Sequence, residues 1–148
     1  MFKGIVIGIQ GFVAVVIIAP ITEELFFRGI ILNGLLLIYK PFKSIFVSAL
    51  LFGLIHLNPW QLLPAITAGV LIGWIYYKTN NILLCIFIHG FNNASNYFME
   101  KLEYYLPGLS YDLNNGVQFQ PYWLNIVGLL LLIISILIIN KNKSNCFE

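Results

Sequence analysis

Long runs of apolar residues, separated by short polar breaks, divide the chain into six segments. Runs of this kind are typical of helices in lipid, where an open strand edge would leave backbone groups unpaired. Proline or asparagine stands at most of the breaks, and proline cannot continue the hydrogen-bond ladder of a helix. The pattern therefore predicts an all-α chain of about six helices. The segments cover approximately residues 4–19, 22–39, 44–57, 62–77, 81–99 and 121–140.

The boundary at Pro20 stays open at this stage. Residues 4–39 form either two helices or one long helix broken at the proline, and the residue pattern does not decide between them.

The lysines predict the membrane topology. With six crossings, nearly all lysines fall on one side, which the positive-inside rule makes cytoplasmic. Without a turn at Pro20, the N-terminus changes side while every later loop keeps its own. The lysines on the common side are Lys3, Lys40, Lys43, Lys78, Lys141 and Lys143.

Composition places these helices in a membrane. Of the 148 residues, 59% are hydrophobic and only 9% are charged, whereas a soluble domain carries about 25% charged residues. Residues 124–139 contain no charge, and with residues 121–123 they reach the ~20 residues that span a bilayer. We expect one polytopic membrane domain over residues 1–148, with its core at about 10–100 and a C-terminal transmembrane helix at about 121–140. Abundant Ile, Asn and Lys suggest a bacterial cell membrane.

Charged side chains within these apolar segments are few. The first group is Glu23, Glu24 and Arg28. Glu24 and Arg28 are four residues apart, so on a helix they share a face and can form an ion pair. Glu23 points about 100° away from Glu24 and is free to face another partner. A capping role explains two acids near a helix start, but it does not explain an arginine deeper in the segment. Ionisable residues in a membrane helix are candidates for function.

Two histidines form the second and third groups. His56 ends an apolar segment, and His89 begins a polar stripe that continues through Asn93 and Asn96 at helical spacing. A single histidine is commonly a packing residue, and polar groups along a stripe can bond between helices instead of acting on a ligand. All three groups lie at similar depth in their helices. They can therefore converge in one shielded, membrane-embedded cavity.

The combined set suits hydrolysis. A carboxylate can act as general base for water, and imidazoles can position water, bind a metal or stabilise an oxyanion. Two other functions stay open. One is a non-catalytic membrane scaffold or immunity protein of the same fold. The other is a small proton-coupled transporter, although no internal repeat supports it. The net charge of +2 is too small to suggest a nucleic-acid partner.

Three short motifs resemble those of the CPBP intramembrane protease family, which includes CAAX proteases and bacteriocin-processing (Abi) proteins. The family pattern is E-E-x-x-x-R, F-x-x-x-H and H-x-x-x-N. The chain has Glu23-Glu24-x-x-x-Arg28, Phe52-x-x-x-His56 and His89-x-x-x-Asn93, in that order. The resemblance covers roughly residues 10–100 and implies a helical bundle with a catalytic cavity inside the membrane.

The resemblance also implies roles for six residues. Glu23 would activate water, Glu24 and Arg28 would support it, and the remaining three would bind metal or water and stabilise the tetrahedral intermediate: His56, His89 and Asn93. Family members are usually described as metalloproteases. Glu23, His56 and His89 are thus candidate ligands of Zn²⁺ or another divalent metal, and a metal-free mechanism stays open. We expect a peptide or protein substrate, used in peptide processing or bacteriocin self-immunity, and an oligomer is compatible with the short chain.

Overall fold

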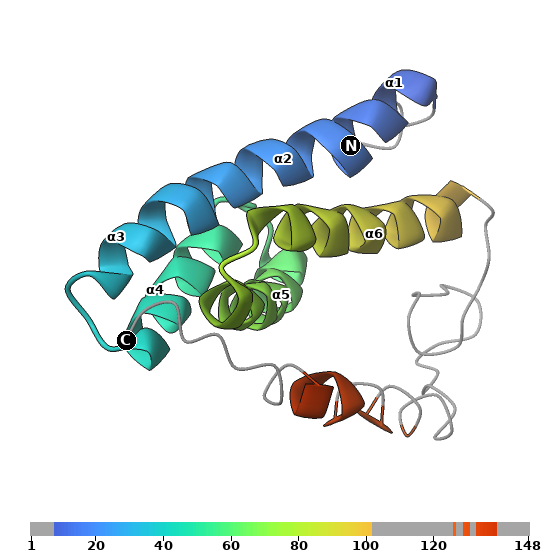
Figure 1. Ribbon diagram of the computed structural model, residues 1–148. Helices are drawn as coiled ribbons and strands as arrows, with labels where there is room; N and C mark the ends of the chain where they lie inside the picture. The colour runs from blue at the N-terminus through green and yellow to red at the C-terminus, as the bar shows by residue number, and fades with distance from the viewer. Residues whose placement is uncertain (1–7, 102–125, 127–128, 131–132, 139–148) are drawn as a thin grey trace. The chain divides into compact units, whose positions relative to one another are not determined.

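The computed structural model describes residues 8–101, 126, 129–130 and 133–138 (Figure 1). Every regular element in these ranges is a helix, which confirms the all-α prediction. The described residues up to Ala94 belong to one compact unit, and those from Ser95 onward belong to a second. The expected single domain stays a prediction. The elements are α1 (Ile9–Phe12), η1 (Val13–Ile18), α2 (Ala19–Glu24), η2 (Leu25–Leu32), α3 (Asn33–Leu36), α4 (Pro41–Leu54), α5 (Pro59–Thr79) and α6 (Ile82–Lys101).

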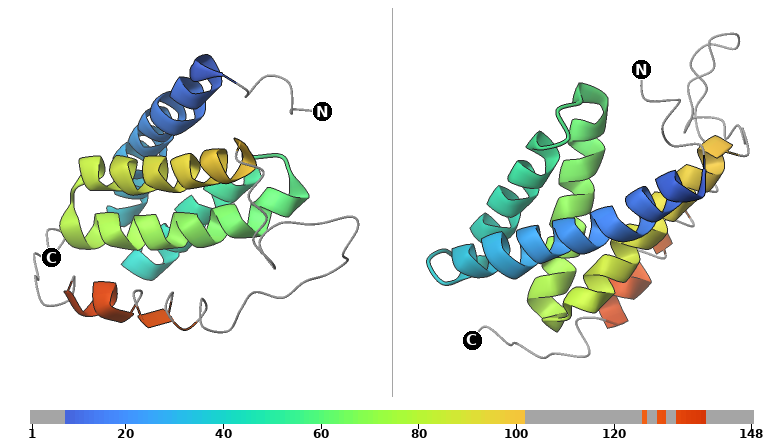
Figure 2. Two further views of the ribbon diagram at one scale, coloured as in Figure 1. Left: turned by 90° about the vertical axis from the view of Figure 1, so that its right-hand side faces the viewer. Right: turned by 90° about the horizontal axis from the view of Figure 1, so that it is seen from above.

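The first five elements form one uninterrupted helix from Ile9 to Leu36, drawn in blue in Figures 1 and 2. The segments η1 and η2 are π-helical, and the junction residues keep right-handed helical dihedral angles throughout. Pro20 therefore marks no turn, and the expectation of about six helices is wrong at this boundary. A proline inside a helix removes one backbone N–H and crowds the carbonyl of the preceding turn, yet the chain continues as a helix through Pro20.

The later helices begin close to the predicted breaks. Pro41 and Pro59 each stand at the first position of a helix, where the missing N–H would have no partner in any case. Asn80 ends α5 with a positive φ of 48°, a conformation that asparagine tolerates at helix ends. Asn81 then caps α6, because its side-chain oxygen accepts the N–H of Leu84 at 3.0 Å. Helical residues also occur between 126 and 138, inside the predicted last helix.

Helices α4 and α5 pack closely through small residues. A Cβ added to Gly69 would lie 3.0 Å from the Cβ of Ala49 and 3.1 Å from its Cα. A Cβ on Gly53 would lie 2.5 Å from the side chain of Ile66. Small residues that let two backbones approach are typical of helix pairs in membranes. The carbonyl of Gly69 also faces the long N-terminal helix, where it accepts a hydrogen bond from Arg28.

Substitution of Gly69 by alanine is expected to destabilise the fold by about 1–3 kcal/mol, because the added methyl group meets the Ala49 backbone rather than a flexible side-chain end. The midpoint of thermal unfolding in detergent micelles measures this effect. Gly34→Ala is the matched control, since nothing lies within 4 Å of a Cβ added there. The control should leave stability unchanged or raise it by up to about 1 kcal/mol. Equal midpoints for G69A and the wild type would contradict the close α4–α5 packing.

Two clusters of buried apolar side chains hold the first unit together. The larger joins η2, α4, α5 and α6, and the smaller joins η2, α4 and α5 beneath the polar residues of the site. Within the described ranges, no single helical element combines the length and apolar character needed to cross a bilayer. The larger cluster contains Leu32, Ile45, Ile72, Tyr76 and Cys85, and the smaller contains Phe27, Phe52 and Ala65.

Candidate active site

Glu24 is the centre of a buried hydrogen-bond network. Its side chain has no solvent exposure, and one carboxylate oxygen, Oε1, accepts from two partners. Arg28 donates to it from Nη1 at 2.9 Å, and the Nδ1 atom of His89 lies 2.8 Å away. Arg28 also donates from Nη2 to the carbonyl of Gly69 at 3.1 Å. The ion pair predicted from the i, i+4 spacing is therefore confirmed, and it also connects the long helix to α5 and α6.

The contact with Glu24 fixes the orientation of the His89 ring. A carboxylate oxygen only accepts hydrogen bonds, so Nδ1 of His89 carries the hydrogen. In the neutral ring, Nε2 is then an acceptor. Nε2 lies 3.7 Å from Oε2 of Glu23, whose side chain keeps 26% of its exposure. That separation is too long for a direct hydrogen bond, but one water can bridge the two atoms. Glu24 thus positions His89, and Glu23 faces the ring edge that stays available.

Phe52 packs against both histidines. Its ring lies edge-on to His56 at 5.0 Å and to His89 at 5.6 Å between centroids. The Arg28 guanidinium carbon lies over the Phe52 ring, 5.1 Å from its centroid. Nδ1 of His56 bonds to the carbonyl of Phe52 at 2.8 Å, so in the neutral ring Nε2 of His56 is likewise an acceptor. The phenylalanine of the second motif therefore orients its histidine through the backbone and supports the other through its ring.

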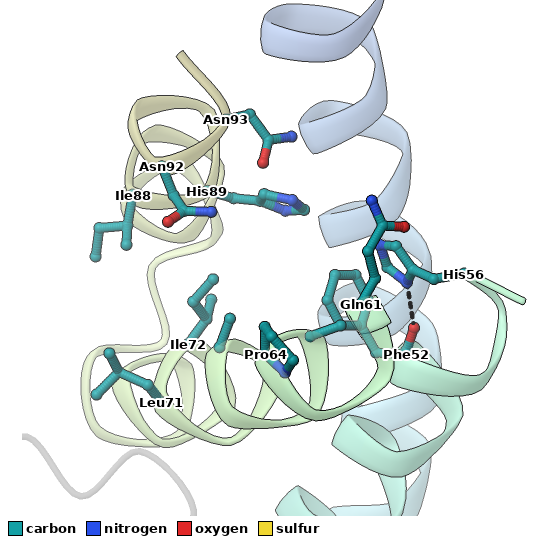
Figure 3. A pocket seen from close by; sticks show the side chains of 12 residues that line it. Phe52, His56, Gln61, Pro64, Leu71, Ile72, Ile88, His89, Asn92 and Asn93 are labelled. Carbon is teal, nitrogen blue, oxygen red and sulfur yellow. Dashed lines mark hydrogen bonds between the residues drawn. The ribbon is translucent and has the colours of Figure 1, made fainter. Parts of the chain in front are cut away.

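A cavity of about 320 Å³ lies beside the two histidines. Figure 3 shows His89 reaching across it from α6, with His56 and Gln61 on the opposite side. The polar lining comes from the two histidines, Gln61 and two asparagines, and the other lining side chains are apolar. The lining does not include Glu23, Glu24 or Arg28. The lining residues are Phe52, His56, Gln61, Pro64, Ala65, Ala68, Leu71, Ile72, Ile88, His89, Asn92 and Asn93.

The predicted metal ligands are not gathered at one point. Across residues 8–101 and the described part of the last helix, no three His, Cys, Asp or Glu side chains are placed so that they could hold a metal ion. Glu23 approaches Nε2 of His89 at 3.7 Å, and Nδ1 of each histidine is held by another partner, so Nε2 is the ring atom left for a ligand. Since the described residues place no third side chain with them, we derive no step through a metal.

Asn93 makes a contact that the sequence did not suggest. Its side-chain nitrogen donates to the backbone carbonyl of Val15 at 3.0 Å. The backbone carbonyls of Val15 and Gly69 thus accept hydrogen bonds from Asn93 and Arg28. The sequence does not reveal such acceptors, because every residue has a backbone carbonyl. Gln61 and Asn92 also line the cavity. Asn92 is a polar residue within an apolar segment, whereas Gln61 falls between two predicted segments and carries no signal in the sequence.

The chain is similar to proteins of a described family. Residues 6–95, more than half of the chain, match the family described as type II CAAX prenyl endopeptidase Rce1-like. A curated relative is the UPF0177 protein YxdF of Lactococcus lactis subsp. lactis (strain IL1403), 35% identical over 74 residues. That alignment covers 49% of this chain and 40% of the relative, so the chain spans about two fifths of the relative's length. No solved structure matches the chain.

The matched region contains all three motifs and every residue of the network around Glu24. It ends two residues after Asn93 and leaves the C-terminal helix outside. The relationship expected from the motifs is confirmed. The chain belongs to the type II CAAX prenyl endopeptidase Rce1-like family.

Proposed function

We propose that the protein is a membrane endopeptidase that hydrolyses a peptide bond with water activated by Glu23. The observation that carries this proposal is the double contact on Glu24, which turns Nε2 of His89 toward Oε2 of Glu23 at 3.7 Å. A carboxylate and an imidazole acceptor that can bridge one water are the groups needed to position and deprotonate it. The adjoining cavity gives a peptide access to the same ring.

The proposed steps balance without a further reactant. Water held between His89 and Glu23 attacks the scissile carbonyl carbon, and the Glu23 carboxylate takes its proton. The tetrahedral intermediate then expels the amine, which receives the proton from Glu23, and a new carboxyl terminus is released. Zn²⁺ or another divalent metal at Glu23, His56 and His89 stays a prediction from the sequence, and these steps do not depend on it.

A membrane setting is part of the proposal. Large apolar side chains are exposed on the helices and their connections, as at Ile9 (81%), Leu37 (86%) and Leu57 (92%), whereas Glu24 and Arg28 are buried. This distribution, polar inside and apolar outside, suits a lipid environment. Family membership supports the same location. We propose a polytopic bundle in a bacterial cell membrane, with the loops near 40 and 78 cytoplasmic and, since Pro20 makes no turn, the N-terminus on the other side.

The experiment is a cleavage assay with the purified full-length protein in detergent or liposomes. Two reporter peptides are compared, one ending in a prenylated C-a-a-X sequence and one apolar peptide without a lipid, and products are identified by mass spectrometry. Cleavage of either peptide supports the peptidase function and indicates the substrate class. Cleavage of the peptide without a lipid would favour processing of exported peptides or bacteriocin self-immunity. If neither is cleaved under conditions where the protein is folded, the scaffold alternative is preferred.

A further inference from the structure

One carbonyl of the long helix, that of Val15, has lost its backbone partner to Pro20. In η1 the hydrogen bonds run from each carbonyl to the N–H five residues later, and the N–H of Ala19 bonds to the carbonyl of Ala14. Continuing this pattern, the carbonyl of Val15 would pair with the N–H of residue 20. Proline has no N–H, so that carbonyl needs another donor. A backbone group left unpaired away from water is costly.

Helix α6 supplies the donor and packs directly on this part of the backbone. The side-chain nitrogen of Asn93 donates to Val15 at 3.0 Å. A carbonyl only accepts, so the amide is fixed with its nitrogen toward the helix. One turn earlier on α6, a Cβ added to Gly90 would lie 3.0 Å from the carbonyl oxygen of Val16 and 4.0 Å from the Cγ of Pro20. A side chain at this position would force the two backbones apart by a small shift.

This contact lies one helical turn from the candidate active site. His89 precedes Asn93 by four residues on α6. On the long helix the acceptor is the carbonyl of Val15, which points toward Pro20, and Pro20 precedes Glu24 by four residues. His89 must reach Glu24 across the same interface, at 2.8 Å. We propose that Asn93 is a positioning residue that fastens α6 to the carbonyl left free by Pro20 and thereby holds His89 against Glu24. The family resemblance would instead place Asn93 on water or the intermediate.

The test uses the imidazole nitrogen NMR spectrum of the full-length protein, labelled at histidine with ¹⁵N. The chain has two histidines, so each ring is separately visible. Asn93→Ala is expected to remove the persistent Nδ1–H signal of His89. The signal of His56 should persist, because its partner is the Phe52 carbonyl within the same helical turn. Asn96→Ala, at an exposed asparagine on the same stripe, is the matched control and should change neither ring.

Pro20→Ala supplies the missing N–H and gives the second half of the test. In the double variant Pro20→Ala/Asn93→Ala, Val15 regains a backbone partner, so the His89 signal should return. Loss of the signal in N93A without recovery in the double variant would overturn the link to Pro20. An unchanged His89 signal in N93A would overturn the positioning role itself. If N93A does not fold, Gly90→Ala decides. Its Cβ pushes α6 away from Val16 and should weaken the signal, and no weakening refutes the proposal.

The consequence for activity rests on the proposed function. A loosened His89 should lower kcat by about 10²-fold with KM within twofold, as expected for misplacement of a catalytic group, and P20A should recover much of that loss in the double variant. A residue acting directly on the intermediate would cost about 10²–10³-fold with or without Pro20. The NMR measurement needs no substrate. It therefore tests the positioning role of Asn93 even if no peptidase activity is detected.

Discussion

Replacement of Glu23 by glutamine is expected to abolish peptide hydrolysis while leaving the protein folded and inserted. The side chain keeps its size, but the amide cannot take the proton of the attacking water. A positioned general base contributes about 10²–10⁴-fold to the rate, and the loss in kcat should fall in that range. The fold should persist, because Glu23 is partly exposed and its nearest polar partner, His89, is at 3.7 Å.

The rate of reporter cleavage, compared between E23Q and wild type at equal protein content, measures this loss. Thr22→Val is the matched control on the preceding residue. Its hydroxyl bonds only to the carbonyls of Ile18 and Ala19 in its own helix, so the variant should cleave at the wild-type rate. Full cleavage by E23Q would contradict the role of Glu23. Undiminished biological activity of an E23Q protein without cleavage would favour the scaffold alternative.

Replacement of Glu24 by leucine should cause the largest loss of stability. It leaves the Arg28 guanidinium, 1% exposed, with only the Gly69 carbonyl as a hydrogen-bond acceptor and no opposing carboxylate. Removing one partner of a buried ion pair costs about 3–5 kcal/mol, because the other charge stays buried and uncompensated. The same change removes the acceptor that orients His89, so activity should also disappear.

The midpoint of thermal unfolding in micelles separates these two effects. The double variant Glu24→Leu/Arg28→Met carries no unpaired charge, and replacing both members of a buried pair is often neutral or stabilising. It should therefore recover most of the stability lost by E24L and none of the activity. A single E24L variant that unfolds at the wild-type temperature would show that the pair is not buried as described.

Local features of the site could be predicted from the sequence. The Glu24–Arg28 pair follows from an i, i+4 spacing on one helix, which needs no knowledge of the partner helices. The starts of α4 and α5 follow from Pro41 and Pro59, since proline is favoured at the first position of a helix. The orientation of Glu23 away from Glu24 follows from helical geometry as well.

The contacts between helices could not be predicted in the same way. Continuity through Pro20 depends on whether another helix brings a donor to the freed carbonyl of Val15, and Asn93 is 78 residues away. The second acceptor of Arg28 is the backbone of Gly69, which has no side chain to reveal it. The predicted metal set requires Glu23, His56 and His89 to meet at one point, and their spacing in the sequence does not reveal whether packing brings them together. Which ring atom stays available is decided by packing.

The most direct test of the central claim, that Glu23 activates water for attack on a peptide bond, is a single-turnover cleavage in H₂¹⁸O with excess enzyme. Attack by water places one ¹⁸O in the new carboxyl terminus during the first turnover, as mass spectrometry of the released fragment would show. A carboxylate that attacked the substrate itself would form an anhydride, and its hydrolysis at the glutamyl carbon would leave an enzyme oxygen in the fragment, which would then be unlabelled. We predict a singly labelled fragment; an unlabelled fragment, or no fragment from the folded protein, would contradict the mechanism.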